Sequence, residues 1–203
     1  MTQAKSSGKF HSARLDILEY SKNYFYKVIS DRVESNLHKF YFPSPEEFKF
    51  IVYGDSRGTW DNWKNATLVA HAIEKEGIPF VFNTGDMVKN GERKEEWEKF
   101  MEIAVFMHNS SLYVSLGNHD IPCIYFKKYF YLPRNERWYS FDYGKVHFTI
   151  LNSNSSLSSQ LLWLEKDPST EKNMENSNIS SSIIQFWASW KFGGNKKNIR
   201  SSF

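Results

Sequence analysis

Three short apolar runs in the middle of this chain each end at a glycine that is followed by a polar side chain. Helical patterns separate the runs. Short strands that alternate with helices favour a parallel sheet, and ligands in such sheets gather at the loops that follow the strands. We therefore predict an α/β layered domain with its site at one sheet edge. The three junctions are Tyr53-Gly54-Asp55, Asn83-Thr84-Gly85-Asp86 and Leu116-Gly117-Asn118.

The other elements follow from local patterns. A helix is predicted to begin after Asp61, which can cap it, and to stop at Gly77. A second, amphipathic helix is predicted from Glu92 to His108, with its large apolar side chains on one side. The predicted strands cover residues 48–53, 78–83 and 112–116, and a hairpin joins 138–142 to 145–152 around Tyr143-Gly144.

The composition divides the chain into four parts. Residues 1–42 contain strand-like alternation, with Tyr24, Tyr26 and Val28 on one face. Residues 43–47 are rich in proline and form a predicted linker. Residues 48–168 carry the α/β pattern, whereas residues 169–203 are rich in Ser, Asn and Ile and show no periodicity.

Bulk properties exclude several classes of protein. The chain has 203 residues and a net charge of +3, and its basic residues are scattered, so nucleic-acid binding is not predicted. The single cysteine, Cys123, excludes an internal disulfide framework. The polar N-terminus lacks the apolar core of a signal peptide, and no run has membrane-spanning length. We expect a soluble chain that is not exported.

The polar residues at the three junctions could hold metal ions. Asp55 and Asp86 offer hard oxygen donors suited to Mg, Mn, Fe or Zn, and Asn118 adds an amide oxygen without charge. One carboxylate can bridge two ions while the other binds the first. Two ions held a few ångströms apart can generate hydroxide and stabilise an in-line displacement at phosphorus. Asp55, Asp86 and Asn118 are therefore our candidate metal ligands.

Three further residues are candidate catalytic groups. His119 could donate a proton to the phosphoryl oxygen or the leaving group, and Asp120 could orient its imidazole. Arg57 could clamp a phosphate oxygen. A single Gly-Asp pair is more often a turn than a ligand. The ordered set of three on successive strand ends favours a site.

These motifs resemble those of the calcineurin-like metallophosphoesterases. The spacing from Gly85-Asp86 to Gly91 and the motif Gly117 to Asp120 carry the resemblance, and Phe141 to Gly144 looks like the middle segment of the family. The chain is most similar to the purple-acid-phosphatase-like branch, in which a fibronectin-III-like domain precedes the catalytic domain. Residues 1–42 would be the last strands of that domain. Intact relatives are often exported.

The resemblance implies a metallophosphoesterase-type layered β-sandwich flanked by helices, incomplete here. It also implies two divalent or mixed-valence metal ions of the Mn, Fe, Zn or Mg type, and a phosphate mono- or diester as substrate. The chain departs from the family at Arg57, where a histidine is usual, and at Lys89, where purple enzymes have a tyrosine ligand. The late His-bearing motifs are missing. We expect impaired hydrolysis, or alternatively a non-catalytic remnant or binding module.

The tail suggests a change of reading frame. The codons of Met174-Glu175 contain a shifted Trp codon, and the shifted frame can encode a His-His-Pro run like the missing motif. We therefore expect residues 169–203 to be an aberrant, out-of-frame tail, and those from about 173 to 190 not to pack as a native element. The nucleotide sequence tests this hypothesis.

Overall fold

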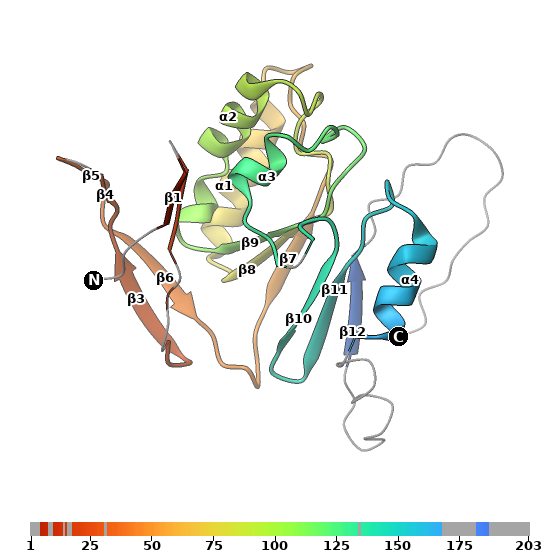
Figure 1. The fold of residues 1–203 in the computed structure, drawn as a ribbon. Coiled ribbons are helices and arrows are strands. Elements are labelled where there is room, and N and C mark those ends of the chain that lie inside the picture. Colours follow the sequence, from red (N-terminus) through yellow and green to blue (C-terminus); the bar gives the residue numbers. More distant parts are fainter. Residues whose placement is uncertain are drawn as a thin grey trace.

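A parallel three-stranded sheet forms the centre of the molecule. The structure is a computed structural model that describes residues 5–7, 10–13, 15, 18–30, 32–133, 135–167 and 182–186. The central sheet has the strand order β7-β8-β9, and all its strands run in the same direction (Figure 1). The three predicted strands and their parallel arrangement are thereby confirmed. Their bounds are Phe50–Tyr53 for β7, Phe80–Asn83 for β8 and Ser111–Val114 for β9.

Helices connect these strands. Helix α1 (Lys64–Glu76) ends at Gly77, whose φ of 61° confirms the predicted stop. Its N-cap is Trp63, but the Asp61 carboxylate still accepts the Asn65 N–H at 3.0 Å. The second predicted helix is in fact two elements, α2 (Lys94–Ile103) and the 3-10 helix η1 (Val105–His108).

The break between α2 and η1 occurs at Ala104, which has a ψ of 51°. Beyond it, Phe106 is buried and meets Tyr53 edge-on, with ring centroids 5.9 Å apart. The core between these helices and one face of the sheet also contains the short helix α3 (Phe126–Tyr129). The most deeply buried side chains of this core are Val81, Met87, Val88, Trp97, Phe106, Val114 and Phe126.

A second sheet covers the other face of the first. Its hairpin is the predicted one, and it consists of β10 (Tyr139–Tyr143) and β11 (Val146–Ile150). Stacked aromatic rings fill the space between the sheets, and the ring centroids of Phe82 in β8 and Phe148 in β11 are 5.0 Å apart. Helix α4 (Leu157–Glu165), capped by Ser156, lies beyond this second sheet (Figure 1). The layered α/β fold is therefore the predicted one.

One strand contradicts an expectation about the tail. Strand β12 (Ser182–Phe186) pairs in parallel with β11, with Val146 opposite Ser182 and Ile150 opposite Phe186. The expectation that this stretch would not pack as an element is therefore wrong for the backbone of these five residues. Backbone pairing depends little on side-chain identity, so an edge strand can form from an aperiodic sequence. Residues 168–181 and 187–203 lie outside the described residues.

Short strands precede the central domain. The predicted alternation belongs to β3, which pairs antiparallel with β6. The Tyr26 hydroxyl donates to the His108 carbonyl at 2.9 Å, and the His38 and His108 rings stack 4.2 Å apart. The fibronectin-III-like assignment of this region, and its boundary at residue 42, remain predictions. The strands are β1 (Lys5–Ser7), β2 (Phe10–Ser12), β3 (Lys22–Tyr26), β4 (Ile29–Ser30), β5 (Val33–Glu34) and β6 (His38–Phe42).

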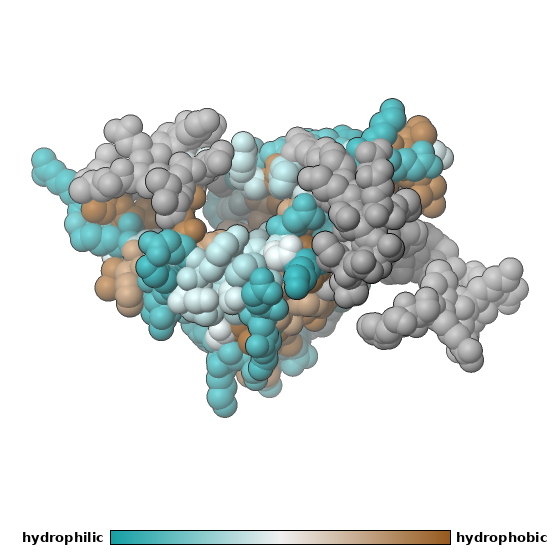
Figure 2. Space-filling model, turned by 90° about the horizontal axis from the view of Figure 1, so that it is seen from below, coloured by the Kyte–Doolittle hydropathy of each residue, from teal (hydrophilic) through white to brown (hydrophobic). Residues whose placement is uncertain are grey.

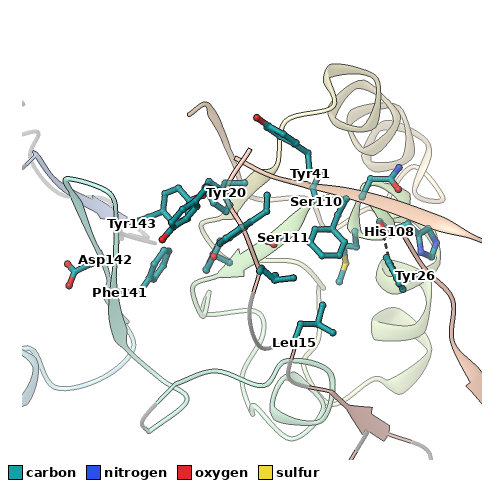
Figure 3. A pocket seen from close by; sticks show the side chains of 17 residues that line it. Leu15, Tyr20, Tyr26, Tyr41, His108, Ser110, Ser111, Phe141, Asp142 and Tyr143 are labelled. Atoms are coloured by element: carbon teal, nitrogen blue, oxygen red, sulfur yellow. Dashed lines mark hydrogen bonds between the residues drawn. The ribbon is translucent and has the colours of Figure 1, made fainter. Parts of the chain in front are cut away.

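An aromatic cavity of about 590 Å³ lies between the β3–β6 pair and the central domain (Figure 3). The rings of Tyr20 and Tyr143, both in its lining, meet edge-on. Ser111, the first residue of β9, also lines the cavity. Seen from below, the molecule has apolar areas scattered among hydrophilic ones (Figure 2). None of the described helices is long and apolar enough to cross a membrane.

Candidate active site

The loops that follow β7, β8 and β9 are fastened to one another. The Asp55 N–H donates to the Gly85 carbonyl at 3.0 Å, and the Arg57 N–H donates to the Asp86 carbonyl at 3.1 Å. The His119 N–H donates to the Asp86 Oδ1 at 3.0 Å. The middle loop thus bonds to both of its neighbours, as expected for the carboxyl ends of adjacent parallel strands.

Glycine makes the closest approach of these loops possible. A Cβ at Gly85 would lie 2.5 Å from the Gly117 nitrogen, and the φ of 105° at Gly85 is one that L side chains rarely adopt. A Cβ at Gly117 would lie 2.2 Å from the Asp86 nitrogen. The glycines of the second and third junctions therefore allow the middle and last loops to touch through their backbones.

Both candidate carboxylate ligands sit on left-handed backbone. Asp55 has a φ of 52° and Asp86 a φ of 58°. Aspartate tolerates this region better than most residues, and such conformations cluster at ligand sites. The hydrogen bonds between the loops hold the two residues in this conformation.

Asp120 has a different role from the predicted one. Its buried carboxylate accepts N–H groups from Asp86 and Gly117 on Oδ2, each at 2.9 Å. Its Oδ1 accepts those of Met87 at 2.9 Å and Val88 at 3.3 Å. Burial raises the pKa of Asp120 to about 7, although the N–H groups of Gly117, Val88 and Met87 and the charge of Arg57 act to lower it. Asp120 therefore holds the middle loop, and it is not the acceptor for the His119 imidazole.

The imidazole of His119 is oriented by a backbone carbonyl instead. Its Nδ1 lies 2.8 Å from the Lys89 oxygen. Because a carbonyl only accepts, Nδ1 carries the proton and Nε2 remains for another partner. The ring borders a cavity of about 520 Å³, which Lys89, Arg93 and Asn118 also line. The candidate catalytic residue His119 thus borders a cavity that two basic residues also line.

The Arg57 side chain contacts both candidate carboxylates, and its role as a phosphate clamp remains a prediction. Its Nη2 lies 3.1 Å from the Asp55 Oδ1, and its Nη1 contacts the Asp86 Oδ2. The guanidinium carbon stands 5.5 Å from the centre of the Trp60 ring. Arg57 is therefore occupied by the two carboxylates that were predicted to bind metal.

Asn118 is exposed. Its side chain makes no hydrogen bond to Asp55 or Asp86 in the described part of the chain, and it lines the cavity beside His119. Asp55 and Arg57 line another cavity, of about 360 Å³, between the first loop and α1. The structure brings Asp55, Arg57 and Asp86 into contact, and joins His119 to them through its backbone.

Sequence reasoning missed Glu96. This buried residue accepts the N–H groups of Lys89 and Asn90 on Oε2, at 2.8 Å and 3.1 Å. It thereby fixes the turn whose carbonyl orients His119. An acidic residue in the first turn of a helix was the available signal, because such residues stabilise helix N-termini.

The described residues do not fit a pair of metal ions. Asp55 and Asp86 are suitable oxygen donors, but a fixed guanidinium already pairs with both. No cluster of at least three His, Cys, Asp or Glu side chains within the described ranges could hold a metal ion.

Comparisons with known proteins agree with this architecture. The chain is 26% identical over 194 residues to phosphoenolpyruvate phosphatase from Allium cepa, and the match covers 80% of this chain and 38% of that protein. Its fold is similar to that of a purple acid phosphatase from yellow lupin (Lupinus luteus) seeds, with a TM-score of 0.62 and 19% identity over 77% of this chain and 35% of that one. The chain thus spans well under half the length of each relative.

The family model for calcineurin-like phosphoesterases matches residues 48–199. This range includes all three fastened loops and both sheets. The chain therefore belongs to the calcineurin-like phosphoesterase family.

Proposed function

We propose that this chain is a phosphatase-type hydrolase of phosphate mono- or diesters with an impaired metal centre. Family members use dinuclear metal centres. The observation that carries the proposal is the joining of three polar loops at one sheet edge, with Asp86 bonded to both neighbours. Asp55, Asp86 and Asn118 remain the ligands that we propose for any metal ion that the chain takes up.

The cavity beside His119 supports a phosphate-ester substrate. Lys89 and Arg93 place two positive charges at its wall, against the one negative charge of Glu96, and the excess attracts an anionic ester. His119, with Nδ1 held by the Lys89 carbonyl, directs its chemistry through Nε2. When both ring nitrogens are protonated, Nε2 can donate a hydrogen bond or a proton to the leaving oxygen, whereas in the neutral ring with the proton on Nδ1 it can only accept. We propose that the substrate lies in this cavity.

A phosphatase assay tests the proposal. The full chain, supplied with Mn²⁺, should hydrolyse p-nitrophenyl phosphate or its bis ester slowly, and Asp86→Asn should abolish the reaction. Glu102→Gln, on an exposed carboxylate that pairs only with Lys99 in the described residues, is the matched control and should leave the rate unchanged. Equal rates for Asp86→Asn and the unsubstituted chain would refute the proposal.

One observation favours a second candidate, a non-catalytic binding module. The contacts of Arg57 with both carboxylates give each of them a cationic partner without any metal ion. A module of this kind should bind neither Mn²⁺ nor phosphate esters, so neither would raise its unfolding temperature. Stabilisation by Mn²⁺ that disappears in Asp86→Asn would exclude it.

A further inference from the structure

The side chain of Arg57 lies between the two carboxylates that face each other from the first and second loops. One guanidinium nitrogen is 3.1 Å from the Asp55 carboxylate, and the other contacts the Asp86 carboxylate. We infer that Arg57 is the resident cation of this site, and that a divalent metal ion must displace it in order to bind. Metal affinity is therefore limited by Arg57.

The position of Arg57 is held at several points. Its own N–H bonds to the Asp86 carbonyl at 3.1 Å, which fixes the start of the side chain. The guanidinium lies 5.5 Å from the centre of the Trp60 ring, within the range of a cation–π contact. Only 15% of the side chain is exposed. A planar guanidinium that is fixed in this way keeps its hydrogen bonds at a lower entropic cost than a flexible lysine would.

The charges explain why metal and arginine exclude each other. The two carboxylates carry two negative charges and Arg57 returns one positive charge. A divalent ion bound to the same oxygens would lie within a few ångströms of the guanidinium, and the two positive charges would repel. The repulsion is strongest beside the buried Asp86, because the Asp55 side chain is 75% exposed and solvent screens the charges there. Arginine cannot lose its proton in a protein, so no change of pH within the stable range removes this competitor.

The geometry of Asp86 adds to the effect. Its Oδ1 already accepts the His119 N–H at 3.0 Å, and its Oδ2 contacts Arg57. Only 9% of the side chain is exposed, so water cannot readily replace a lost partner. An ion that binds to Asp86 must therefore break a buried charge-assisted contact, whereas an ion that binds after removal of Arg57 meets an unpaired carboxylate.

The test is a titration of the full chain with Co²⁺, followed by calorimetry and by the visible absorption of the bound ion. Arg57→Gln removes the charge and keeps a similar length, and Arg57→His adds a donor in its place. Both should bind Co²⁺ more tightly than the unsubstituted chain by about tenfold or more. Arg57→Lys keeps the charge and should gain less than about threefold.

Arg137→His is the matched control. Arg137 is exposed, and it lines neither the cavity beside His119 nor the one beside Asp55. This variant should leave Co²⁺ affinity unchanged. Adding Asp86→Asn to Arg57→Gln should remove the gained binding. The inference is overturned if the unsubstituted chain binds Co²⁺ as tightly as Arg57→Gln, or if Arg137→His gains as much.

The inference rests on the proposed function only in taking Asp55 and Asp86 as the carboxylates that face a metal ion. The two can therefore fail separately. Tighter Co²⁺ binding by Arg57→Gln without hydrolysis by any variant supports the inference and refutes the proposed hydrolase. Hydrolysis by the unsubstituted chain with no gain of metal affinity in Arg57→Gln or Arg57→His supports the hydrolase and overturns the inference. Circular dichroism confirms beforehand that both variants fold.

Discussion

Replacement of Asp120 by asparagine tests the hydrogen-bond network that fastens the middle loop. The carboxylate accepts four backbone N–H groups, two on each oxygen. An amide oxygen can keep two of them, whereas the amide nitrogen would face the other two as a third donor. Each buried N–H left without an acceptor costs about 1–3 kcal/mol. Burial raises the pKa of Asp120 to about 7, because the ionised carboxylate is costly to bury. The neutral asparagine avoids this cost, which offsets part of the loss.

We expect a net loss of about 2–4 kcal/mol for Asp120→Asn, or a fall in Tm of roughly 5–15 °C for a chain of this size. Urea and thermal unfolding at about pH 8, where the carboxylate is ionised, measure it through tryptophan fluorescence, to which the buried Trp97 contributes. Glu102→Gln is the control and should change stability by less than about 0.5 kcal/mol. A loss for Asp120→Asn no larger than that of the control would refute the assigned role of Asp120.

Three further predictions use the same measurements. The buried Tyr139 hydroxyl bonds to both backbone groups of Val114, so Tyr139→Phe should cost about 1–3 kcal/mol in urea unfolding. Gly117→Ala would place a methyl group 2.2 Å from the Asp86 nitrogen, and should lower Tm by several degrees and abolish any hydrolysis. Burial and a neighbouring imidazole lower the pKa of His108, so the folded state binds fewer protons than the unfolded chain just below the ordinary value of about 6.5. The stability that the neutral His108 ring contributes should therefore be present above about pH 6.5 and lost as the pH falls below it. His108→Gln should flatten this dependence of stability on pH.

Most of the central fold could be predicted because local patterns and tertiary packing agree there. The apolar runs are too short for helices, and each ends at a glycine that the neighbouring loop requires. The break at Ala104 could not be predicted, because the apolar spacing of α2 continues through it. Strand β12 could not be predicted because its sequence shows no hydrophobic period, while its pairing with β11 uses backbone groups.

The site was predictable only in outline. Sequence order placed Asp55, Asp86 and Asn118 on successive strand ends, and the structure confirms that these ends are neighbours. It could not show where each side chain points. Arg57 turns toward the carboxylates because Asp55 has a φ of 52° and because the Arg57 N–H bonds to the next loop. Such directions depend on contacts between residues about 30 positions apart, which no local pattern encodes.

The Gly-Asn-His-Asp motif does not by itself establish catalysis, because most of its groups have structural partners. Gly117 and Asp120 fasten the middle loop, and the His119 carbonyl accepts the Gly91 N–H at 2.8 Å. A chain without activity would need these groups in order to fold. The exposed Asn118 amide is different, because no hydrogen bond in the described residues requires it. Asn118→Ala should therefore change the unfolding free energy by less than about 0.5 kcal/mol in either case. In a phosphoesterase, however, it should reduce hydrolysis about tenfold or more, because an oxygen ligand is lost. Unchanged hydrolysis with unchanged stability would mean that the amide takes no part in the reaction.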